Sequence, residues 1–335
     1  MKKKKWMLAV ALPVTILLLL SSCRGPQSAS DSGAKLVKLR IGVDAGTFSA
    51  SYRIADLKGY YKKYGIDAQI TTYSYGIDTL NAILTGQTDV GIAADYAALS
   101  RFSTNKLRVI SYVQQVNPES SKILARSDVN SINQLTGKSL GVAKATVGEY
   151  ETTLLLEKYN LRNVKRVALS SNTEIVAAFQ RGDIQAGIFS GTALAQAQTV
   201  SGAKVIGSLK DINFAPRAFI VSSTDIAKKD SKTLVNLLKA LDESLTWVNK
   251  NEDAAADLLA QQLTAPKAST LQELKSYTFE LRLSTADVQQ LKDINDDAAK
   301  SNLYDTNFKV QDIVDTAPLK QALPSKFSYK AENLK

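Results

Sequence analysis

Residues 86–92 read GQTDVGI, and a related stretch, GDIQAGI, occupies residues 182–188, with the two copies starting 96 residues apart. In each copy a glycine precedes a short apolar segment typical of a buried strand, and helical patterns lie on both sides. With the same offset Ser74 aligns with Ser170. Strands that alternate with helices of about ten residues indicate a parallel sheet. The repeat therefore predicts two α/β lobes of equivalent wiring, with a ligand cleft between them.

The hydrophobic pattern extends this interpretation along the chain. The first lobe is expected over residues 37–126 and 218–335, and the second over residues 127–217. Predicted strands occupy residues 37–43, 67–73, 89–93, 107–113, 139–143, 164–169, 185–189 and 204–206. Predicted helices occupy residues 52–64, 76–84, 95–103, 147–159 and 173–179, and another begins at Thr192. From residue 224 onward we expect scaffold helices, over residues 234–247, 253–263, 270–279 and 285–299.

Two short β-like segments, residues 121–126 and 217–222, stand at the two ends of the second lobe. We interpret them as strands by which the chain crosses from one lobe to the other and returns. Two such crossings would form a hinge about which the lobes can close.

The N-terminus has the pattern of an exported lipoprotein. Residues 1–22 combine a basic start, Lys2 to Lys5, with an apolar run that is short for a membrane-spanning helix. Leu20-Ser21-Ser22-Cys23 resembles the lipobox that precedes a lipidated cysteine; the alternative is a plain signal peptide that contains a cysteine. Residues 23–36 then form a predicted lipidated cysteine and flexible tether, rich in Ser, Ala and Gly.

Composition excludes several classes of site. The chain has no histidine and one cysteine, which rules out histidine general bases, Cys/His metal sites and an intramolecular disulfide. The formal charge of +10 falls to about +6 without the basic start, and the remaining cations are scattered. We therefore expect no cofactor, no metal and no nucleic-acid partner.

The stretch LGVAKATVGEY, residues 140–150, predicts a strand that turns directly into a helix. Thr146 and Glu149 have the spacing of a capping box. The first-turn N–H groups of Val147 and Gly148 can still point into the cleft, where a helix N-terminus favours negative charge.

Several of these motifs resemble one known family. They are LRIG at 39–42, LKGYYKKYGID at 57–67, LNAILTGQTDVG at 80–91, LTGKSLGV at 135–142 and KATVGEY at 144–150. Together they resemble ABC-transporter solute-binding proteins of the nitrate, sulfonate, taurine and thiamine-pyrimidine-precursor group. The resemblance implies an α/β, type II periplasmic-binding-protein fold of two lobes joined by two crossing strands. It also implies a monomer that delivers a small solute to a membrane permease with its ATPase.

The resemblance carries ligand contacts onto matching positions of this chain. They are Ser49, Ala50, Tyr52, Tyr75, Gly76, Asp95, Thr146, Val147, Gly148, Phe189, Ser190, Asn213 and Arg217. Asp95 is either an N-cap or an amine ligand, and Arg217 either holds an anion or makes a hinge salt bridge. Many relatives have an acidic residue where this chain has Ser190, which argues against a cationic ligand.

We expect an extracytoplasmic lipoprotein, anchored to the outer face of the membrane through Cys23, that captures a small sulfonate-like anion by lobe closure. The alternative solute is a neutral or aromatic heterocycle, such as a thiamine pyrimidine precursor, stacked on Tyr52, Tyr75, Tyr96 or Phe189. A function of another class is an extracellular sensor. Another class is an enzyme of the same fold, as in pyrimidine-precursor synthases. Those depend on histidine and a cysteine cluster, and this chain has neither, so we do not expect an enzyme.

Overall fold

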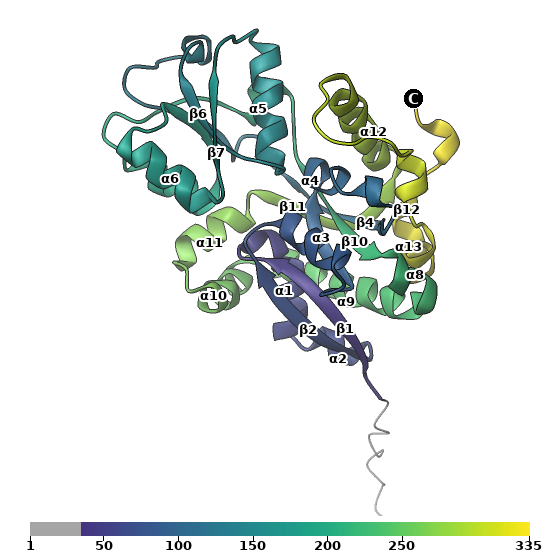
Figure 1. Cartoon of the computed structure of the whole chain (residues 1–335). Coiled ribbons are helices and arrows are strands. Elements are labelled where there is room, and N and C mark those ends of the chain that lie inside the picture. The colour runs from purple at the N-terminus through teal and green to yellow at the C-terminus, as the bar shows by residue number, and fades with distance from the viewer. Residues whose placement is uncertain (1–34) are drawn as a thin grey trace, which may run out of the picture. The chain divides into compact units, whose positions relative to one another are not determined.

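The structure is a computed structural model that describes residues 35–335 (Figure 1). The predicted signal peptide, the lipobox at Cys23 and most of the predicted tether lie outside the described residues. Within residues 35–335 the strands form two sheets, one of seven strands and one of five. Helices pack on both sheets, as with α3 (Gly76–Leu84) on the first and α6 (Asn172–Arg181) on the second. The predicted two-sheet α/β architecture is therefore present.

The first sheet combines parallel and antiparallel strands. From edge to edge it contains β12 (Phe327–Ser328), β11 (Tyr277–Ser284), β4 (Leu107–Val116), β10 (Arg217–Ser223), β3 (Val90–Ala94), β1 (Val37–Asp44) and β2 (Ile66–Tyr73). Strands β1, β2 and β3 run parallel, and β10 and β11 pair with β4 antiparallel. All five residues of β3 are buried, as expected for a central strand covered on both faces.

The helices of the first lobe start close to the predicted positions. They are α1 (Ala50–Leu57), α2 (Tyr60–Lys63), α3 and α4 (Asp95–Leu99). A single helix over residues 52–64 was predicted, but Gly59 has φ of 72° and separates α1 from α2. A left-handed glycine ends one helix and lets the chain start the next at a new angle.

The second sheet is built around the second copy of the repeat. In order it contains β7 (Lys165–Leu169), β6 (Ser139–Ala143), β8 (Ala186–Phe189), β5 (Lys122–Ala125) and β9 (Lys204–Ser208). Its helices are α5 (Val147–Lys158), α6 and α7 (Gly191–Gln198). The second glycine of each repeat lies on a crowded central strand: a Cβ would come within 2.5 Å of Thr79 at Gly91, and within 2.7 Å of Phe189 at Gly187. The repeated glycines thus share one packing role.

The predicted crossing strands, 121–126 and 217–222, belong to the sheets themselves. Strand β5 pairs with β8 and β9, whereas β10 pairs with β3 and β4. The chain therefore passes between the sheets in two irregular segments, residues 117–121 and 213–216. The first run of strands of the first sheet consequently ends with β4 at Val116, and β5 (Lys122–Ala125) already belongs to the second sheet.

The C-terminal part is mostly helical, as predicted, but it also supplies a strand. Its helices are α8 (Thr224–Lys229), α9 (Ser231–Lys250), α10 (Glu252–Leu263), α11 (Lys267–Leu274), α12 (Thr285–Lys300) and α13 (Ala317–Ala322). The helix predicted over residues 270–279 ends at Leu274, and β11 follows. In β11, Phe279, Leu281 and Leu283 are buried in alternation, the period of a strand with one face on the core.

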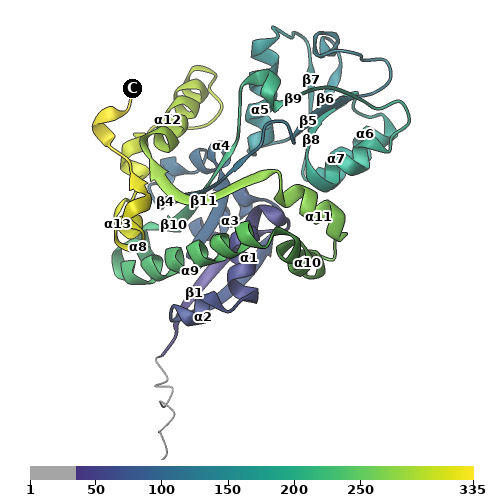
Figure 2. The ribbon, with the colours of Figure 1, turned by 180° about the vertical axis from the view of Figure 1, so that it is seen from behind.

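Helix α9 holds the first lobe together from behind (Figure 2). Its buried residues include Leu234, Leu237, Leu238 and Leu241, and it contacts α1, α2 and α13. Burial of one leucine side chain stabilises a fold by roughly 1.5–3 kcal/mol, so this stripe fixes the helices beneath the first sheet.

Candidate ligand-binding site

A cavity of about 230 Å³ lies where residues at the carboxyl ends of strands from both sheets meet. Asp44 ends β1, Ala143 ends β6 and Phe189 ends β8; both crossing segments contribute as well, through Ser121 and Pro216. Ligands of open α/β sheets bind at this edge. The cavity is smaller than the roughly 300–1,000 Å³ typical of sites for drug-sized molecules, so it suits a small solute.

Seven of the predicted ligand-binding residues belong to the wall of this cavity. They are Tyr75, Gly76, Thr146, Val147, Gly148, Phe189 and Ser190. All of them follow or end a parallel strand, which is where the strand–turn–helix pattern predicted them. That they contact a ligand remains a prediction.

The start of α3 brings Tyr75 and Gly76 to the cavity. The Tyr75 hydroxyl donates a hydrogen bond of 3.1 Å to Oδ1 of Asn172, the first residue of α6, and so joins the two lobes. Burial raises the pKa of Tyr75 to about 12, so it stays a donor at neutral pH. A Cβ at Gly76 would lie 2.8 Å from the carbonyl oxygen of Ile92. Glycine therefore lets α3 begin this close to β3.

The turn from β6 into α5 is capped by Thr146, as predicted, but in a different pattern. The Thr146 hydroxyl accepts from the N–H of Gly148 at 3.2 Å and donates to the carbonyl of Ala143 at 2.7 Å. The Glu149 carboxylate accepts from the N–H of Ala145 at 2.9 Å and not from Thr146. The predicted capping box is thus wrong in detail. The N–H of Gly148 is occupied, so a ligand could use Val147 but not Gly148 without rearrangement.

Ala145 adopts a left-handed backbone conformation within this turn, with φ of 59°. A non-glycine residue in this region costs roughly 1–2 kcal/mol. Such strain often accompanies a binding loop whose shape is held by its surroundings. Here the Glu149 carboxylate holds the N–H of Ala145 and also accepts from the Tyr96 hydroxyl at 3.2 Å.

Three carboxyl groups of the cavity wall, Asp44, Glu151 and Glu273, were not predicted from the sequence. Among the residues that the structure describes, neither a lysine nor an arginine lines the same cavity. Two of the acids had a readable signal. Asp44 ends the first strand, and Glu151 follows Val147 by four residues, so it shares that helix face. Glu273 comes from a helix that was expected to be scaffold.

Asp44 and Glu273 line the first-lobe side of the cavity. The Asp44 carboxylate accepts from the Ser49 hydroxyl at 2.5 Å and from the N–H of Gly46 at 2.8 Å. Burial raises the pKa of Asp44, and these hydrogen bonds counter the rise. Burial also raises the pKa of Glu273, whose carboxyl packs against Gly191 at the start of α7.

Glu151 lies on the second-lobe side and is 7% exposed. Its carboxyl has no hydrogen-bond partner within residues 35–335. Burial, followed by the nearby charge of Asp95, raises the pKa of Glu151 to about 8. A buried carboxylate without a partner is costly. The Thr47 and Tyr277 side chains lower the pKa of Glu273 against its burial, and no group does so for Glu151.

Ser49, Ala50 and Tyr52, predicted to contact the ligand, lie in the core behind the cavity. Helix α1 begins two residues earlier than predicted, at Ala50, which turns these side chains inward. All three are 0% exposed. The Tyr52 hydroxyl donates to the carbonyl of Gly91 at 3.2 Å, and Ser49 acts through its hydrogen bond to Asp44.

Asp95 also lies outside the cavity wall, fully buried at the start of α4. Its carboxylate accepts from the backbone N–H groups of Tyr96 and Arg217, at 2.9 and 3.0 Å, and from Nε2 of Gln290 at 2.7 Å. Burial raises its pKa to about 6, against the lowering by these bonds. It therefore ties the returning crossing segment to the first lobe. Both carboxylate oxygens already accept hydrogen bonds, so the prediction that Asp95 holds an amine is not supported by its position.

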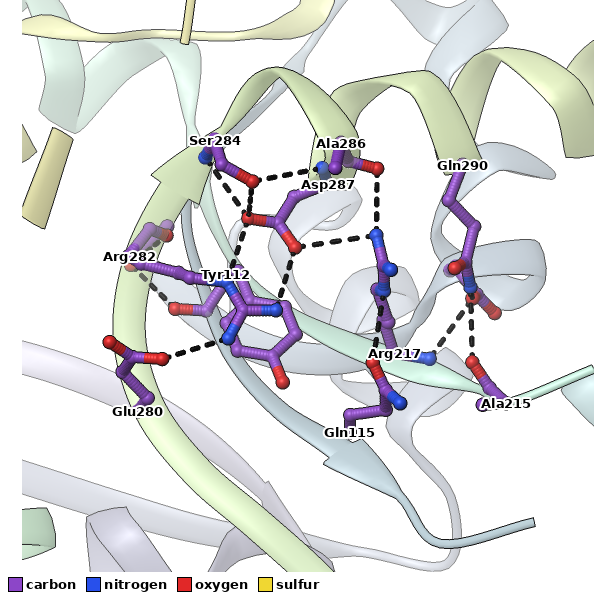
Figure 3. A network of polar contacts seen from close by, with 12 residues as sticks. Tyr112, Gln115, Ala215, Arg217, Glu280, Arg282, Ser284, Ala286, Asp287 and Gln290 are labelled. Carbon is purple, nitrogen blue, oxygen red and sulfur yellow. Dashed lines mark hydrogen bonds and ion pairs between the residues drawn. The ribbon is translucent and has the colours of Figure 1, made fainter. Parts of the chain in front are cut away.

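Arg217 makes the hinge salt bridge that was the alternative interpretation (Figure 3). Its Nη1 donates to the carbonyl of Ala286 at 2.7 Å and lies 3.3 Å from Oδ1 of Asp287. Its Nε donates to Oε1 of Gln115 at 3.2 Å. The guanidinium is thus committed to α12 and β4, so the prediction that it holds an anionic ligand is not supported by its position.

Asn213 does not reach the cavity either. It ends a short 3₁₀ helix, Leu209–Ile212, in a left-handed conformation with φ of 55°. It lies in a shallow depression with Lys158 and Lys210. Its role there is to turn the chain toward the second crossing.

A family model described as NMT1/THI5 like matches residues 47–255, more than half of the chain. The chain belongs to the NMT1/THI5-like family. This family assignment agrees with the resemblance seen in the sequence motifs. A Brucella abortus (strain 2308) relative is 24% identical over 281 residues, which cover 82% of this chain and 83% of the relative. Bacillus subtilis (strain 168) YtlA is 22% identical over 254 residues, 71% of this chain and 72% of its own. Both are provisionally named binding proteins.

Solved structures confirm the predicted two-lobed periplasmic-binding-protein fold of this NMT1/THI5-like chain. The alkanesulfonate-binding protein SsuA from Xanthomonas axonopodis pv. citri, bound to MOPS, has a TM-score of 0.74 at 19% identity, covering 84% of this chain and 99% of its own. The nitrate-binding protein NrtA from Synechocystis PCC 6803 has a TM-score of 0.69 at 12% identity, covering 87% and 89%. These likenesses establish the fold.

Two further observations bear on the surroundings of the site. In the part of the chain from residue 35 onward, no group of three or more acidic or cysteine side chains could hold a metal ion. No helix of that same part is long and apolar enough to cross a membrane.

Proposed function

We propose that this protein is the extracytoplasmic solute-binding lipoprotein of an ABC importer, anchored through Cys23. It captures a small solute between its lobes and presents it to a permease with its ATPase. Its family, its fold and the cavity at the carboxyl ends of the strands support this role. The lipobox-like sequence at residues 20–23 supports the anchor.

Capture requires no covalent chemistry in this proposal. The lobes close about residues 117–121 and 213–216, the two irregular segments that join the sheets. Closure buries the solute and strengthens its polar contacts by excluding water. The hydrogen bond from Tyr75 to Asn172 spans the two lobes and would help to hold the closed arrangement.

Of the two solute classes considered, an aromatic or neutral heterocycle fits this cavity better than a sulfonate. The observation that carries this choice is the wall itself, with three carboxyls and, within the described residues, no lysine or arginine. A helix N-terminus stabilises an anion by about 0.3–1 kcal/mol. An ionised carboxylate 4 Å away would oppose it by roughly 4 kcal/mol at an effective dielectric constant near 20. Among the described wall residues an anion would meet no lysine or arginine, and each wall carboxyl that is ionised would cancel the gain from a helix end.

Aromatic side chains are available for a ring. Phe48, Tyr75, Phe189 and Tyr277 line the cavity. Phe189 is held by Phe179, with ring centroids 5.3 Å apart, and Tyr277 is held by Phe48 at 6.4 Å. Tyr52 and Tyr96, considered earlier for stacking, are not part of the wall. Rings fixed in this way offer stacking without a large loss of side-chain entropy.

Mass spectrometry of the solute that accompanies the natively purified protein tests this proposal. We expect a small nitrogen heterocycle, and we expect added heterocycle to raise the melting temperature while alkanesulfonates do not. A co-purified sulfonate would overturn the solute class. Replacement of Cys23 by Ala should release the protein from the membrane fraction, and continued membrane retention would contradict the anchor.

A further inference from the structure

We propose that Glu151 selects the solute and that the solute is an organic cation, whose protonated nitrogen donates to this carboxyl. This inference rests on the proposed function and names the charge class of its solute. It would make Glu151 the main polar anchor of the cavity, with the aromatic side chains as its walls.

The position of Glu151 leaves its hydrogen-bonding capacity to a ligand. Glu151 is only 7% exposed, and it lines the cavity. The nearest hydroxyls along α5 are already used: Thr152 donates to the carbonyl of Gly148 at 2.8 Å, and Thr153 donates to the carbonyl of Glu149 at 3.0 Å. Buried carboxylates normally have partners. Since the protein supplies none within residues 35–335, the donor should come from the solute.

The charges around Glu151 favour a cation as that donor. Asp95 lies close enough to raise its pKa, and the cavity wall adds Asp44 and Glu273. Each of these groups is neutral or negative. A cation would interact favourably with all of them, whereas an anion would be repelled by every one that is ionised. An amidine-like nitrogen pair could also bind a carboxylate with two parallel hydrogen bonds.

The sequence offered an argument against a cation, because Ser190 stands where many relatives have an acidic residue. Ser190 and Glu151 line the same cavity. Glu151 on α5 thus supplies to the cavity the carboxyl that many relatives have at the position of Ser190. The substitution at residue 190 changes the place of the negative charge, and the cavity keeps its acidic character.

Proton release distinguishes a cation from a neutral solute. In the empty cavity Glu151 holds its proton near neutral pH, since burial and Asp95 raise its pKa to about 8. A bound cation would favour the carboxylate and expel that proton. A neutral acceptor would instead keep the proton on Glu151, as the donor of the hydrogen bond.

The experiment uses three probes of one shape: benzamidine, benzamide and benzoate, which are positive, neutral and negative at pH 7. Calorimetry in two buffers of different ionisation enthalpy measures affinity and proton release together. For the mature wild-type protein we expect benzamidine to bind tightest, with release of up to one proton. Glu151→Gln should weaken benzamidine by about 10–100-fold and abolish the release, while benzamide binding stays within a few-fold.

Glu157→Gln is the matched control, because Glu157 lies on the same helix but is exposed and outside the cavity. The glutamine oxygen can still accept the hydrogen bond of 3.4 Å that the Ser301 hydroxyl donates to Glu157. It should leave both readouts unchanged. Equal affinity of benzamidine for wild type and Glu151→Gln overturns the inference, as does tighter binding of benzamide or benzoate to wild type. Should a solute co-purify while benzamidine has no effect, the inference fails and the proposed function stands. Should no solute co-purify and no heterocycle or sulfonate bind, the proposed function itself fails.

Discussion

Asp287 and Glu151 are both buried carboxyls in this fold, and they differ in what surrounds them. Asp287 is 0% exposed and accepts from Nε and Nη2 of Arg282, each at 3.0 Å, and from the Ser284 hydroxyl at 2.6 Å (Figure 3). Arg217 adds an ion pair at 3.3 Å. Glu151 has no such partner in the described part of the chain.

This difference in hydrogen-bond partners distinguishes a carboxyl that stabilises the fold from one that is available to a ligand. A buried charge is tolerated when other groups of the protein satisfy it, and the network around Asp287 ties α12 to β10 and β11. A buried charge that the protein leaves unsatisfied has a stability cost, which a ligand can remove. A buried carboxyl therefore holds the first lobe together at Asp287, whereas the carboxyl of Glu151 is available to a ligand in the cavity.

Removal of Asp287 should have the largest effect of any change considered. Asp287→Ala leaves Arg282 and Arg217 without their shared partner, and breaking a buried ion pair costs about 3–5 kcal/mol. Urea unfolding should show a loss of this size. Asp293→Ala, an acidic residue on the same helix whose contact with Gln289 is exposed, should change stability by less than about 0.5 kcal/mol. Similar small losses of stability for both variants would show that the ion pairs of Asp287 do not stabilise the fold.

Glu151→Gln should raise the stability of the ligand-free protein at high pH, whereas Asp287→Ala should lower stability. Because the folded pKa of Glu151, about 8, lies above the ordinary value of 4.5, the native state binds the proton more tightly than the unfolded chain. Wild-type stability should therefore fall as pH rises from about 4.5 to 8, and the glutamine variant should escape this fall. Urea unfolding at pH 9 should show the variant more stable by about 2–4 kcal/mol, with little difference at pH 5. A variant less stable than wild type at pH 9 would show that Glu151 has a structural partner.

The two carboxyls also show what sequence can predict. Residues at or after strand ends, such as Tyr75, Thr146 and Phe189, lie in the cavity wall, and their position could be read from the sequence because strand and helix periods are local. Their contact with a ligand remains a prediction. The partner of Arg217 was not predictable, since Asp287 lies far along the chain and on another element. Glu151 was missed because its burial depends on the facing lobe, although its helix face was readable from Val147.

The distance in sequence between contacting residues also explains where the predicted fold was wrong. The repeat predicted two sheets because each copy is a complete local unit of glycine, strand and helix. Strand β11 was not predicted because its eight residues lie between two helices, two residues after α11 and directly before α12, and its pairing partner, β4, is distant in sequence. Ser49 and Tyr52 were misplaced by a shift of two residues in the start of α1. A small local shift is enough to turn a side chain from a cavity into the core.

Thr146 is a polar residue of the cavity wall whose hydroxyl, unlike the carboxyl of Glu151, has partners within the protein. Thr146→Ala therefore tests whether a satisfied group in the wall contributes to binding. The hydroxyl already has two partners, Gly148 and Ala143, so it should contribute to the helix and not to the solute. We expect a loss of about 1 kcal/mol in stability and less than a threefold change in benzamidine affinity. Calorimetry and urea unfolding on the same preparation check both values. A collapse of affinity at unchanged stability would show that the hydroxyl itself holds the solute.

Tyr75→Phe should have the smallest effect on stability and a selective effect on closure. The hydroxyl joins the lobes through Asn172 at 3.1 Å, at an exposed position where water can replace either partner. Loss of this bond should therefore change the free energy of unfolding by less than about 0.5 kcal/mol, at the low end for a hydrogen bond. It should still weaken benzamidine a few-fold, because only the closed arrangement contains the bond. Tyr73→Phe is the control, since its hydroxyl contacts Gln87 of the same lobe. If both variants bind benzamidine as tightly as wild type, the bond between the lobes contributes nothing to capture, and binding depends on the cavity wall alone.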